Sequence, residues 1–269
     1  MTTSIKNLLD LTGKTAIVTG GGLGIGYGIS YRLAEAGANV VIADRTEAHG
    51  ITASEKILSN GWNSIAVKTD ISIETEVKNM VKKTTESYGK IDILVNNAGI
   101  FPSIPLEKMS FQDFRKVLSI NLDGLFLCTK YVSEQMISQG TGGKIINITS
   151  IDALHPSSPG LAHYDASKHG AWGFTKTAAL ELAQHNIMVN AIAPGGIDTP
   201  GVQSMMKPVS SEAPGLSMEK IMKSFMERIP LHRLGDPDEI GKVALFLASE
   251  MSSYMTGSQI VVDGGALLM

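Results

Sequence analysis

Short apolar runs alternate with longer segments of helical period along almost the whole chain. Most of these runs are apolar at every position, which is typical of strands in a sheet that is covered on both faces. The seven runs lie at residues 16–18, 40–43, 65–67, 91–95, 145–148, 187–192 and 260–262. The helical segments between them lie at 24–36, 46–59, 72–88, 110–139, 162–184 and 236–248. This alternation predicts an α/β fold with one doubly wound parallel sheet of seven strands and helices on both faces.

We expect a single domain spanning residues 1–269, because α/β proteins of this length often form one unit. Hydrophobic residues make up 43% of the chain and charged residues 18%, which supplies a large core and argues against disorder. Residues 200–230 break the rhythm of strands and helices and contain five methionines. We therefore expect a substrate lid at about 200–230, with a subunit contact or a surface excursion as the alternative.

Charge and composition exclude several classes of partner. A net charge of −3 gives no electrostatic attraction to nucleic acid or to an anionic membrane. No apolar run reaches the roughly 20 residues that span a bilayer, and the first ten residues lack the apolar core of a signal peptide. One cysteine allows no intrachain disulfide, and the six histidines show no metal-ligand spacing. We expect a cytoplasmic protein without a nucleic-acid, membrane or metal partner.

The first apolar run leads into a glycine-rich sequence at residues 19–26. The spacing G-x-x-x-G-x-G fits Gly20, Gly24 and Gly26, whereas G-x-G-x-x-G fits in no register. Glycines allow a tight turn and a close approach to a pyrophosphate, which the N–H groups of the next helix would bind. The place of this turn, between the first strand and the first helix, predicts a dinucleotide site.

Asp44 ends the second apolar run, 20 residues after Gly24. A carboxylate there can accept hydrogen bonds from the adenosine ribose and repels a 2′-phosphate, so it favours NAD over NADP. Arg45 follows directly and could instead bind that phosphate, which keeps NADP open. A solvated helix cap is the alternative role of Asp44.

Tyr164 and Lys168 are four residues apart near the start of a predicted helix and therefore share a face. An ammonium beside a phenol favours the phenolate, so the pair can accept a proton from an alcohol. Ser150 follows the fifth run, at the sheet edge where α/β proteins bind ligands. Residues 96–99 and 194–199 end two further runs at the same edge, which predicts one common crevice.

These motifs together resemble those of the short-chain dehydrogenase/reductase family over residues 11–265. The chain departs from the family pattern only slightly, with Thr149 at a usual serine and a gap of 14 residues between Ser150 and Tyr164, one longer than usual. The matching motifs are T-G-x-x-x-G-x-G at 19–26, Asp70, N-N-A-G at 96–99, Asn121, N-I-T-S at 147–150, Y-x-x-x-K at 164–168, P-G-x-x-x-T at 194–199 and V-D-G-G at 262–265.

The resemblance implies a Rossmann-type homotetrameric oxidoreductase that transfers hydride between a small molecule and a nicotinamide cofactor. It implies that Tyr164 is the general acid and base, that Lys168 lowers the pKa of Tyr164, and that Ser150 orients the substrate oxygen. It further implies that the backbone carbonyl of Asn121 holds a water that links Lys168 to solvent. The implied cofactor contacts are Gly20, Gly24, Ile25, Gly26, Asp44, Asp70, Ile71, Asn97, Gly99, Tyr164, Lys168, Pro194, Ile197 and Thr199.

The substrate remains open between two chemistries. Asp152, His155 and His163 are polar and close in sequence to Ser150 or Tyr164, so we expect them near the reacting oxygen. The region 150–168 resembles that of some sugar 1-dehydrogenases. The methionine-rich segment instead suits a bulky apolar substrate such as a steroid or cyclic ketone. The expected substrate contacts are Ser150, Asp152, His155 and Tyr164.

The leading interpretation is an NAD-dependent enzyme that interconverts a secondary alcohol and a ketone, with a sugar, polyol or cyclic alcohol as substrate. A 3-oxoacyl-thioester reductase and a hydroxysteroid dehydrogenase are alternatives within the family. Reductases of 3-oxoacyl thioesters in this family usually take NADP, and Asp44 argues against that cofactor. A non-catalytic dinucleotide-binding regulator is a remote alternative, because Asn121, Ser150, Tyr164 and Lys168 are all present.

Overall fold

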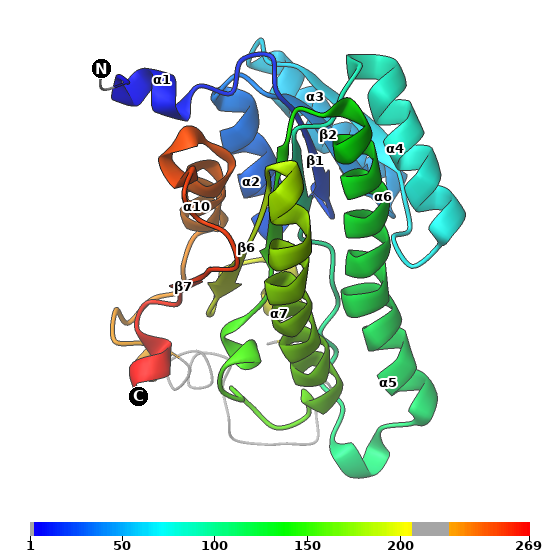
Figure 1. Ribbon diagram of the computed structural model, residues 1–269. Helices are drawn as coiled ribbons and strands as arrows, with labels where there is room; N and C mark the ends of the chain where they lie inside the picture. Colours follow the sequence, from blue (N-terminus) through cyan, green and yellow to red (C-terminus); the bar gives the residue numbers. More distant parts are fainter. Residues whose placement is uncertain (1–2, 206–225) are drawn as a thin grey trace.

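The computed structural model describes residues 3–205 and 226–269 of the chain. Parallel strands form one sheet, of which Figure 1 labels β1, β2, β6 and β7. The strand order is β3-β2-β1-β4-β5-β6-β7, so the winding direction reverses between β1 and β4. The strands are β1 (Thr15–Thr19), β2 (Asn39–Asp44), β3 (Ser64–Lys68), β4 (Ile93–Asn96), β5 (Gly143–Ile148), β6 (Ile187–Pro194) and β7 (Gln259–Val262). This arrangement confirms the predicted doubly wound sheet of seven parallel strands.

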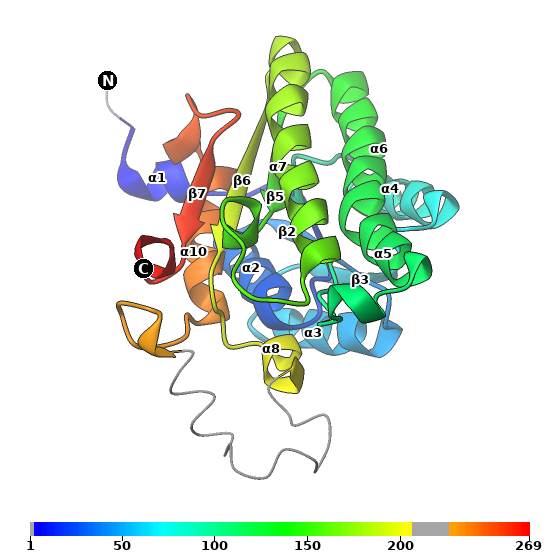
Figure 2. The same ribbon diagram turned by 90° about the horizontal axis from the view of Figure 1, so that it is seen from below.

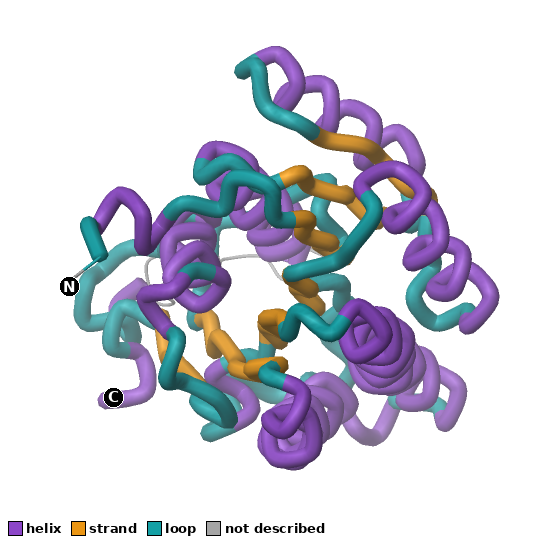
Figure 3. Tube along the Cα trace, turned by 45° about the horizontal axis from the view of Figure 1, so that its top comes forward, coloured by secondary structure: helices purple, strands orange, loops and turns teal. Residues whose placement is uncertain are grey.

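Helices cover both faces of the sheet (Figure 3). One apolar core lies between the sheet and α2, α3 and α10, and a second lies between the sheet and α4, α6 and α7. Ala16 and Val18 of β1 belong to the first core and Ile17 to the second, which explains why the strands are apolar at every position. The helices are α1 (Ile5–Leu9), α2 (Gly24–Glu35), α3 (Glu47–Ser59), α4 (Glu74–Tyr88), α5 (Phe111–Leu118), α6 (Gly124–Gln139), α7 (Ala162–Leu182), α8 (Pro200–Met205) and α10 (Pro237–Ala248).

The predicted helix at 110–139 is interrupted by a wider π-helical turn at Ser119–Asp123, which joins α5 to α6 without a loop (Figure 1). The turn holds Asn121, whose buried side chain bonds Ile100 twice: Nδ2 donates to the carbonyl at 2.9 Å and Oδ1 accepts from the N–H at 2.8 Å. Such turns occur often at functional sites. Here the turn ties the helix to the segment that follows β4.

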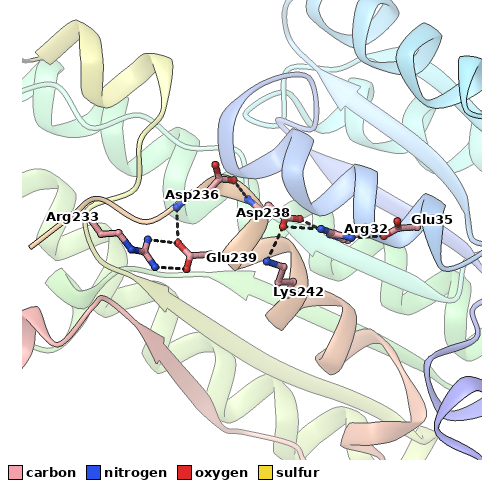
Figure 4. Close-up of polar contacts among 7 residues, drawn as sticks. All are labelled: Arg32, Glu35, Arg233, Asp236, Asp238, Glu239 and Lys242. Carbon is pink, nitrogen blue, oxygen red and sulfur yellow. Dashed lines mark hydrogen bonds and ion pairs between the residues drawn. The ribbon is translucent and has the colours of Figure 1, made fainter. Parts of the chain in front are cut away.

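Helices α2 and α10 cross in close contact beside the first strand. A Cβ on Gly241 would lie 2.5 Å from the carbonyl oxygen of Gly28, so neither helix can move closer. Next to this crossing Arg32 of α2 binds Asp238 of α10, and Asp238 also pairs with Lys242 at 2.9 Å (Figure 4). Packing and charge together fix α2, whose N-terminus borders the glycine-rich turn.

The Arg32–Asp238 pair predicts a pH-dependent contribution to stability. Its hydrogen bond to Arg32 lowers the pKa of Asp238 to about 2, compared with about 3.9 for an unfolded aspartate. The contribution is therefore present above pH ~4 and is lost as the pH falls from about 4 to about 2. We expect Asp238→Asn to lower the free energy of unfolding by about 1 kcal/mol at neutral pH, because solvent screens this partly exposed pair. Urea unfolding at neutral pH and near pH 2 checks this, and an equal loss at both would contradict it.

Candidate active site

The glycine-rich turn lies between β1 and α2 and is as tight as the sequence predicts. Gly20 and Gly24 have φ angles of 60° and 51°, a backbone conformation that residues with a side chain rarely adopt. A Cβ on Gly26 would lie 2.1 Å from the carbonyl oxygen of Gly20. The N-cap residue Leu23 makes no side-chain capping bond, so the first N–H groups of α2 are left for an anion.

Asp44 lies beside this turn at the end of β2. Its Oδ2 accepts a hydrogen bond from the N–H of Gly22 at 3.2 Å, and its Oδ1 accepts one from the N–H of Thr46 at 2.9 Å. Arg45 is exposed. The uncapped helix N-terminus, the crowded glycines and the adjoining carboxylate fit a dinucleotide with its pyrophosphate at the turn.

Asn97 ties the end of β4 to the same turn, a structural role that its motif does not reveal. Its Nδ2 donates to the carbonyls of Thr19 at 2.9 Å and Gly20 at 3.1 Å. The hydroxyl of Thr19 in turn accepts from the N–H groups of Asn97 at 3.0 Å and Ala98 at 3.1 Å. Two neighbouring strand ends are thereby held in fixed register around the predicted cofactor site.

The other predicted cofactor residues surround this end of the sheet. The Cγ2 atom of Thr199 lies 3.1 Å from a Cβ built on Gly24, so residue 199 lies directly at the start of α2. Asp70 accepts hydrogen bonds from the N–H and hydroxyl of Ser72. Ile25 lies in the first turn of α2, and Pro194 ends β6. Ile71, Gly99 and Ile197 follow β3, β4 and β6.

Tyr164, Lys168 and Ser150 meet beside the carboxyl end of β5. The Nζ atom of Lys168 lies 5.5 Å from the centre of the Tyr164 ring and donates to the carbonyl of Ile148 at 2.7 Å. Lys168 is only 5% exposed, and Ser150 is also buried. Phe101 packs against the Tyr164 ring edge to face, with 5.9 Å between centroids. A phenol, an ammonium and a hydroxyl therefore share one largely enclosed cluster, as the sequence predicts.

The electrostatics of this cluster keep the phenol protonated. Burial raises the pKa of Tyr164, a hydrogen bond with Ser150 lowers it, and the charges of Asp152 and Asp165 raise it further. Burial lowers the pKa of Lys168 to about 8, and Asp152 acts in the opposite direction. Tyr164 is therefore a proton donor at neutral pH, and a further positive charge in the site would favour its phenolate.

The three polar residues near Tyr164 in the sequence have different environments. Asp152 is buried and accepts a hydrogen bond from the Ser150 hydroxyl at 2.7 Å. His155 is exposed. His163 is fully buried, and its Nδ1 accepts from the N–H of Tyr164 at 2.9 Å, so it lies inside the start of α7.

A cavity of about 470 Å³ adjoins the segment after β4. The residues that line the cavity are Gly99, Ile100, Phe101, Pro102, Ile104, Asp113, Lys116, Val117 and Gly201.

The predicted lid at 200–230 falls largely outside the described residues. Of this segment the structure describes α8 and the chain from residue 226 onward (Figure 2).

The described residues, 3–205 and 226–269, contain neither a metal-binding cluster nor a membrane-spanning helix. Nowhere in these ranges do three or more His, Cys, Asp or Glu side chains gather closely enough to hold a metal ion. Within the same ranges, every helix is too short or too polar to cross a membrane.

Comparisons with known proteins agree with this fold. A family model described as enoyl-(acyl carrier protein) reductase matches residues 21–266. A 3-oxoacyl-[acyl-carrier-protein] reductase of Synechocystis sp. is 39% identical over 96% of this chain and 98% of its own. A short-chain type dehydrogenase/reductase of Mycobacterium marinum superposes with a TM-score of 0.91 at 34% identity, covering 98% of this chain and 99% of its own.

A gluconate 5-dehydrogenase of Burkholderia cenocepacia, solved in complex with NADP and tartrate, has a TM-score of 0.89 at 32% identity. It covers 99% of this chain and 100% of its own. Sequence and fold thus match over nearly the full length. The chain belongs to the short-chain dehydrogenase/reductase family and is a nicotinamide-dinucleotide-dependent oxidoreductase that acts on CH–OH groups.

Proposed function

We propose that this enzyme interconverts a secondary alcohol and a ketone with NAD(H), and that its substrate is a sugar, polyol or cyclic alcohol. The observation that carries the proposal is the cluster of Tyr164, Lys168 and Ser150, in which an ammonium lies 5.5 Å from a phenol ring. The same cluster contains Asp152, and a buried carboxylate at this place favours a neutral substrate rich in hydroxyls over an anionic one.

Tyr164 acts as the general acid and base in this mechanism. During reduction its phenol donates a proton to the carbonyl oxygen, and during oxidation its phenolate takes the proton of the substrate hydroxyl. The charge of Lys168 stabilises that phenolate, and Ser150 bonds the same substrate oxygen. When bound, the nicotinamide supplies the hydride chemistry.

Asn121 completes the proposed machinery through its backbone carbonyl, which we expect to hold a water that links Lys168 to solvent. Its side chain supports this place in the site: a Cβ on Gly99 would lie 3.2 Å from Asn121 Oδ1 and 3.8 Å from Lys168 Nζ. Both groups therefore border the same residue, beside the end of β4.

The preference for NAD rests on Asp44. Its carboxylate adjoins the turn through the N–H of Gly22, where it would accept hydrogen bonds from ribose hydroxyls and repel a 2′-phosphate. Arg45 is the residue that opposes this assignment, and the Burkholderia structure was solved with NADP. A preference of this chain for NADPH would mean that Arg45 outweighs Asp44.

A 3-oxoacyl-thioester reductase is the second candidate, because the Synechocystis relative carries that name at 39% identity. A hydroxysteroid dehydrogenase agrees with the methionine-rich segment at 200–230, whereas a regulator without catalysis disagrees with the complete set of four catalytic residues.

Titration of the purified protein with NADH and NADPH separates these candidates, followed by a panel of sugars, polyols, cyclic alcohols and hydroxysteroids. We expect NADH to bind at least about tenfold more tightly than NADPH, because one charged hydrogen bond contributes about 1.5–3 kcal/mol. Turnover on a sugar or polyol with NAD⁺ would support the proposal. Tighter binding of NADPH with reduction of a 3-oxoacyl thioester would replace it by the second candidate.

We also propose a cytoplasmic homotetramer. Two large apolar side chains on the subunit surface support the assembly, because a subunit contact would bury them. Leu180 on α7 is 80% exposed, and Leu268 near the C-terminus is 85% exposed. Light scattering of the purified protein tests it, and a monomeric mass would reject it.

A further inference from the structure

Asp152 is a buried carboxylate that forms two hydrogen bonds as acceptor. It lies in a short helical turn, Ile151–Ala153, that follows Ser150 directly, and it is 6% exposed. Its Oδ2 accepts from the Ser150 hydroxyl at 2.7 Å, and its Oδ1 accepts from the N–H of Ser157 at 2.9 Å. Its own N–H donates to Ser150 Oγ at 3.1 Å. The two residues therefore form a closed pair next to Tyr164.

Ser150 has a single hydroxyl hydrogen and three groups that can receive it: Asp152, the oxygen of Tyr164 and the substrate oxygen. A carboxylate at 2.7 Å is the strongest of these acceptors. We propose that Asp152 is a positioning residue of the active site, which holds the Ser150 hydrogen and turns the lone pairs of Ser150 towards Tyr164 and the substrate.

This inference rests on the proposed role of Tyr164 as acid and base, and it concerns how that role is controlled. The charged groups that face Tyr164 are the carboxylates of Asp152 and Asp165 and the ammonium of Lys168. The hydrogen bond with Ser150 lowers the pKa of Tyr164, and Asp152 weakens this effect because it competes for the same Ser150 hydrogen. The charge of Asp152 raises the pKa of Tyr164 and that of Lys168. Both effects keep Tyr164 protonated and Lys168 charged until the cofactor binds.

The substitution Asp152→Asn reverses the direction of the side-chain hydrogen bond between residues 150 and 152. The N–H of Ser157 requires an acceptor, so the amide oxygen takes the place of Oδ1. The amide NH₂ group then faces Ser150 and donates to its oxygen, which releases the Ser150 hydrogen towards Tyr164. The variant removes a charge and frees a hydrogen-bond donor, and both changes favour the phenolate.

A double-mutant cycle separates these two effects. Wild type, Ser150→Ala, Asp152→Asn and the double variant are titrated by the ultraviolet absorbance of the phenolate, free and with saturating NAD⁺. The same titration of each protein with the additional substitution Tyr164→Phe isolates the signal of Tyr164. Changes in the charge of Lys168 occur in both arms of the cycle and therefore cancel.

We expect Asp152→Asn to lower the pKa of Tyr164 by at least about one unit when Ser150 is present. In the Ser150→Ala background the shift should be smaller by at least about half a unit, or about 0.7 kcal/mol. Equal shifts in the two backgrounds would mean that Asp152 acts through its charge alone and would overturn the proposal. Unchanged titration curves would overturn it as well.

Asp165→Asn is the matched control, because Asp165 also faces Tyr164 but the described structure gives its carboxylate no hydrogen bond to Ser150. Its shift should be the same with and without Ser150. If Asp152→Asn does not fold, Asp152→Ala repeats the cycle, since it also removes the charge and releases Ser150. The titration needs no substrate, so a protein that binds neither NADH nor NADPH would reject the proposed function while the free-protein cycle still tests Asp152.

Kinetics supply a second readout once a substrate is found. A carbonyl oxygen must compete with Asp152 for the Ser150 hydrogen, so Asp152→Asn should lower the KM of the ketone several-fold and shift the pH profile of alcohol oxidation to lower pH. A rise in KM together with a fall in kcat and an unshifted pH profile would indicate only a structural role and would count against the proposal.

Discussion

Tyr164→Phe is expected to lower kcat by about 10²–10⁴-fold, the usual contribution of a general acid or base, and to weaken NADH binding far less, because Tyr164 is one of many expected cofactor contacts. The substitution removes only the phenolic oxygen. The ring keeps its edge-to-face contact with Phe101, and Lys168 keeps its hydrogen bond to the carbonyl of Ile148. The loss should therefore fall on proton transfer, and stopped-flow turnover with fluorescence titration of NADH measures both quantities.

Tyr131→Phe is a matched control for this variant. Its hydroxyl bonds Glu74 between α6 and α4, whereas the catalytic cluster lies after β5 and on α7, so its loss should leave kcat unchanged. Full turnover by Tyr164→Phe would assign the proton transfer to another group.

The wild type should also oxidise alcohols faster as the pH rises, because the phenolate is the base.

The sheet could be predicted from the sequence because strands buried on both faces leave a local signal. Residues 40–43 are apolar in succession, and β2 places alternate side chains of this run in the two cores. The break at Ser119–Asp123 left no such signal, because a single π-helical turn is too short to show an apolar period of its own. The turn carries the bonds between Asn121 and Ile100, which join residues far apart in the sequence.

The candidate site was predictable where glycine or a sequence motif constrains the backbone, and less so where side chains meet across strands. Gly24 and Gly26 could be identified because only glycine fits their turn. The bonds of Asn97 to the carbonyls of Thr19 and Gly20 depend on how β1 and β4 pair, which a single motif does not report. Asp152 was identified as polar and near the reaction, but its bond to Ser150 required the folded turn.

The choice of cofactor depends on one carboxylate, so Asp44→Ser should have the second large effect. Loss of a charged hydrogen-bond acceptor for the ribose should weaken NADH binding by about 1.5–3 kcal/mol, roughly tenfold to a hundredfold. NADPH should bind more tightly, because a unit charge about 4 Å from the carboxylate is repelled by about 4 kcal/mol at an effective dielectric constant of 20. The ratio of the two dissociation constants should therefore change by at least about a hundredfold.

Arg45 determines how much more tightly the Asp44→Ser variant binds NADPH. Because Arg45 is exposed beside Asp44, its guanidinium is free to turn towards a 2′-phosphate once the carboxylate is gone. We expect Arg45→Ser alone to leave NADH binding nearly unchanged, and the double variant to lose most of the gain in NADPH binding. Calorimetric titration of the four proteins with both cofactors measures this. An Asp44→Ser variant that still prefers NADH as strongly as the wild type would show that the backbone of the glycine-rich turn, and not Asp44, selects the cofactor.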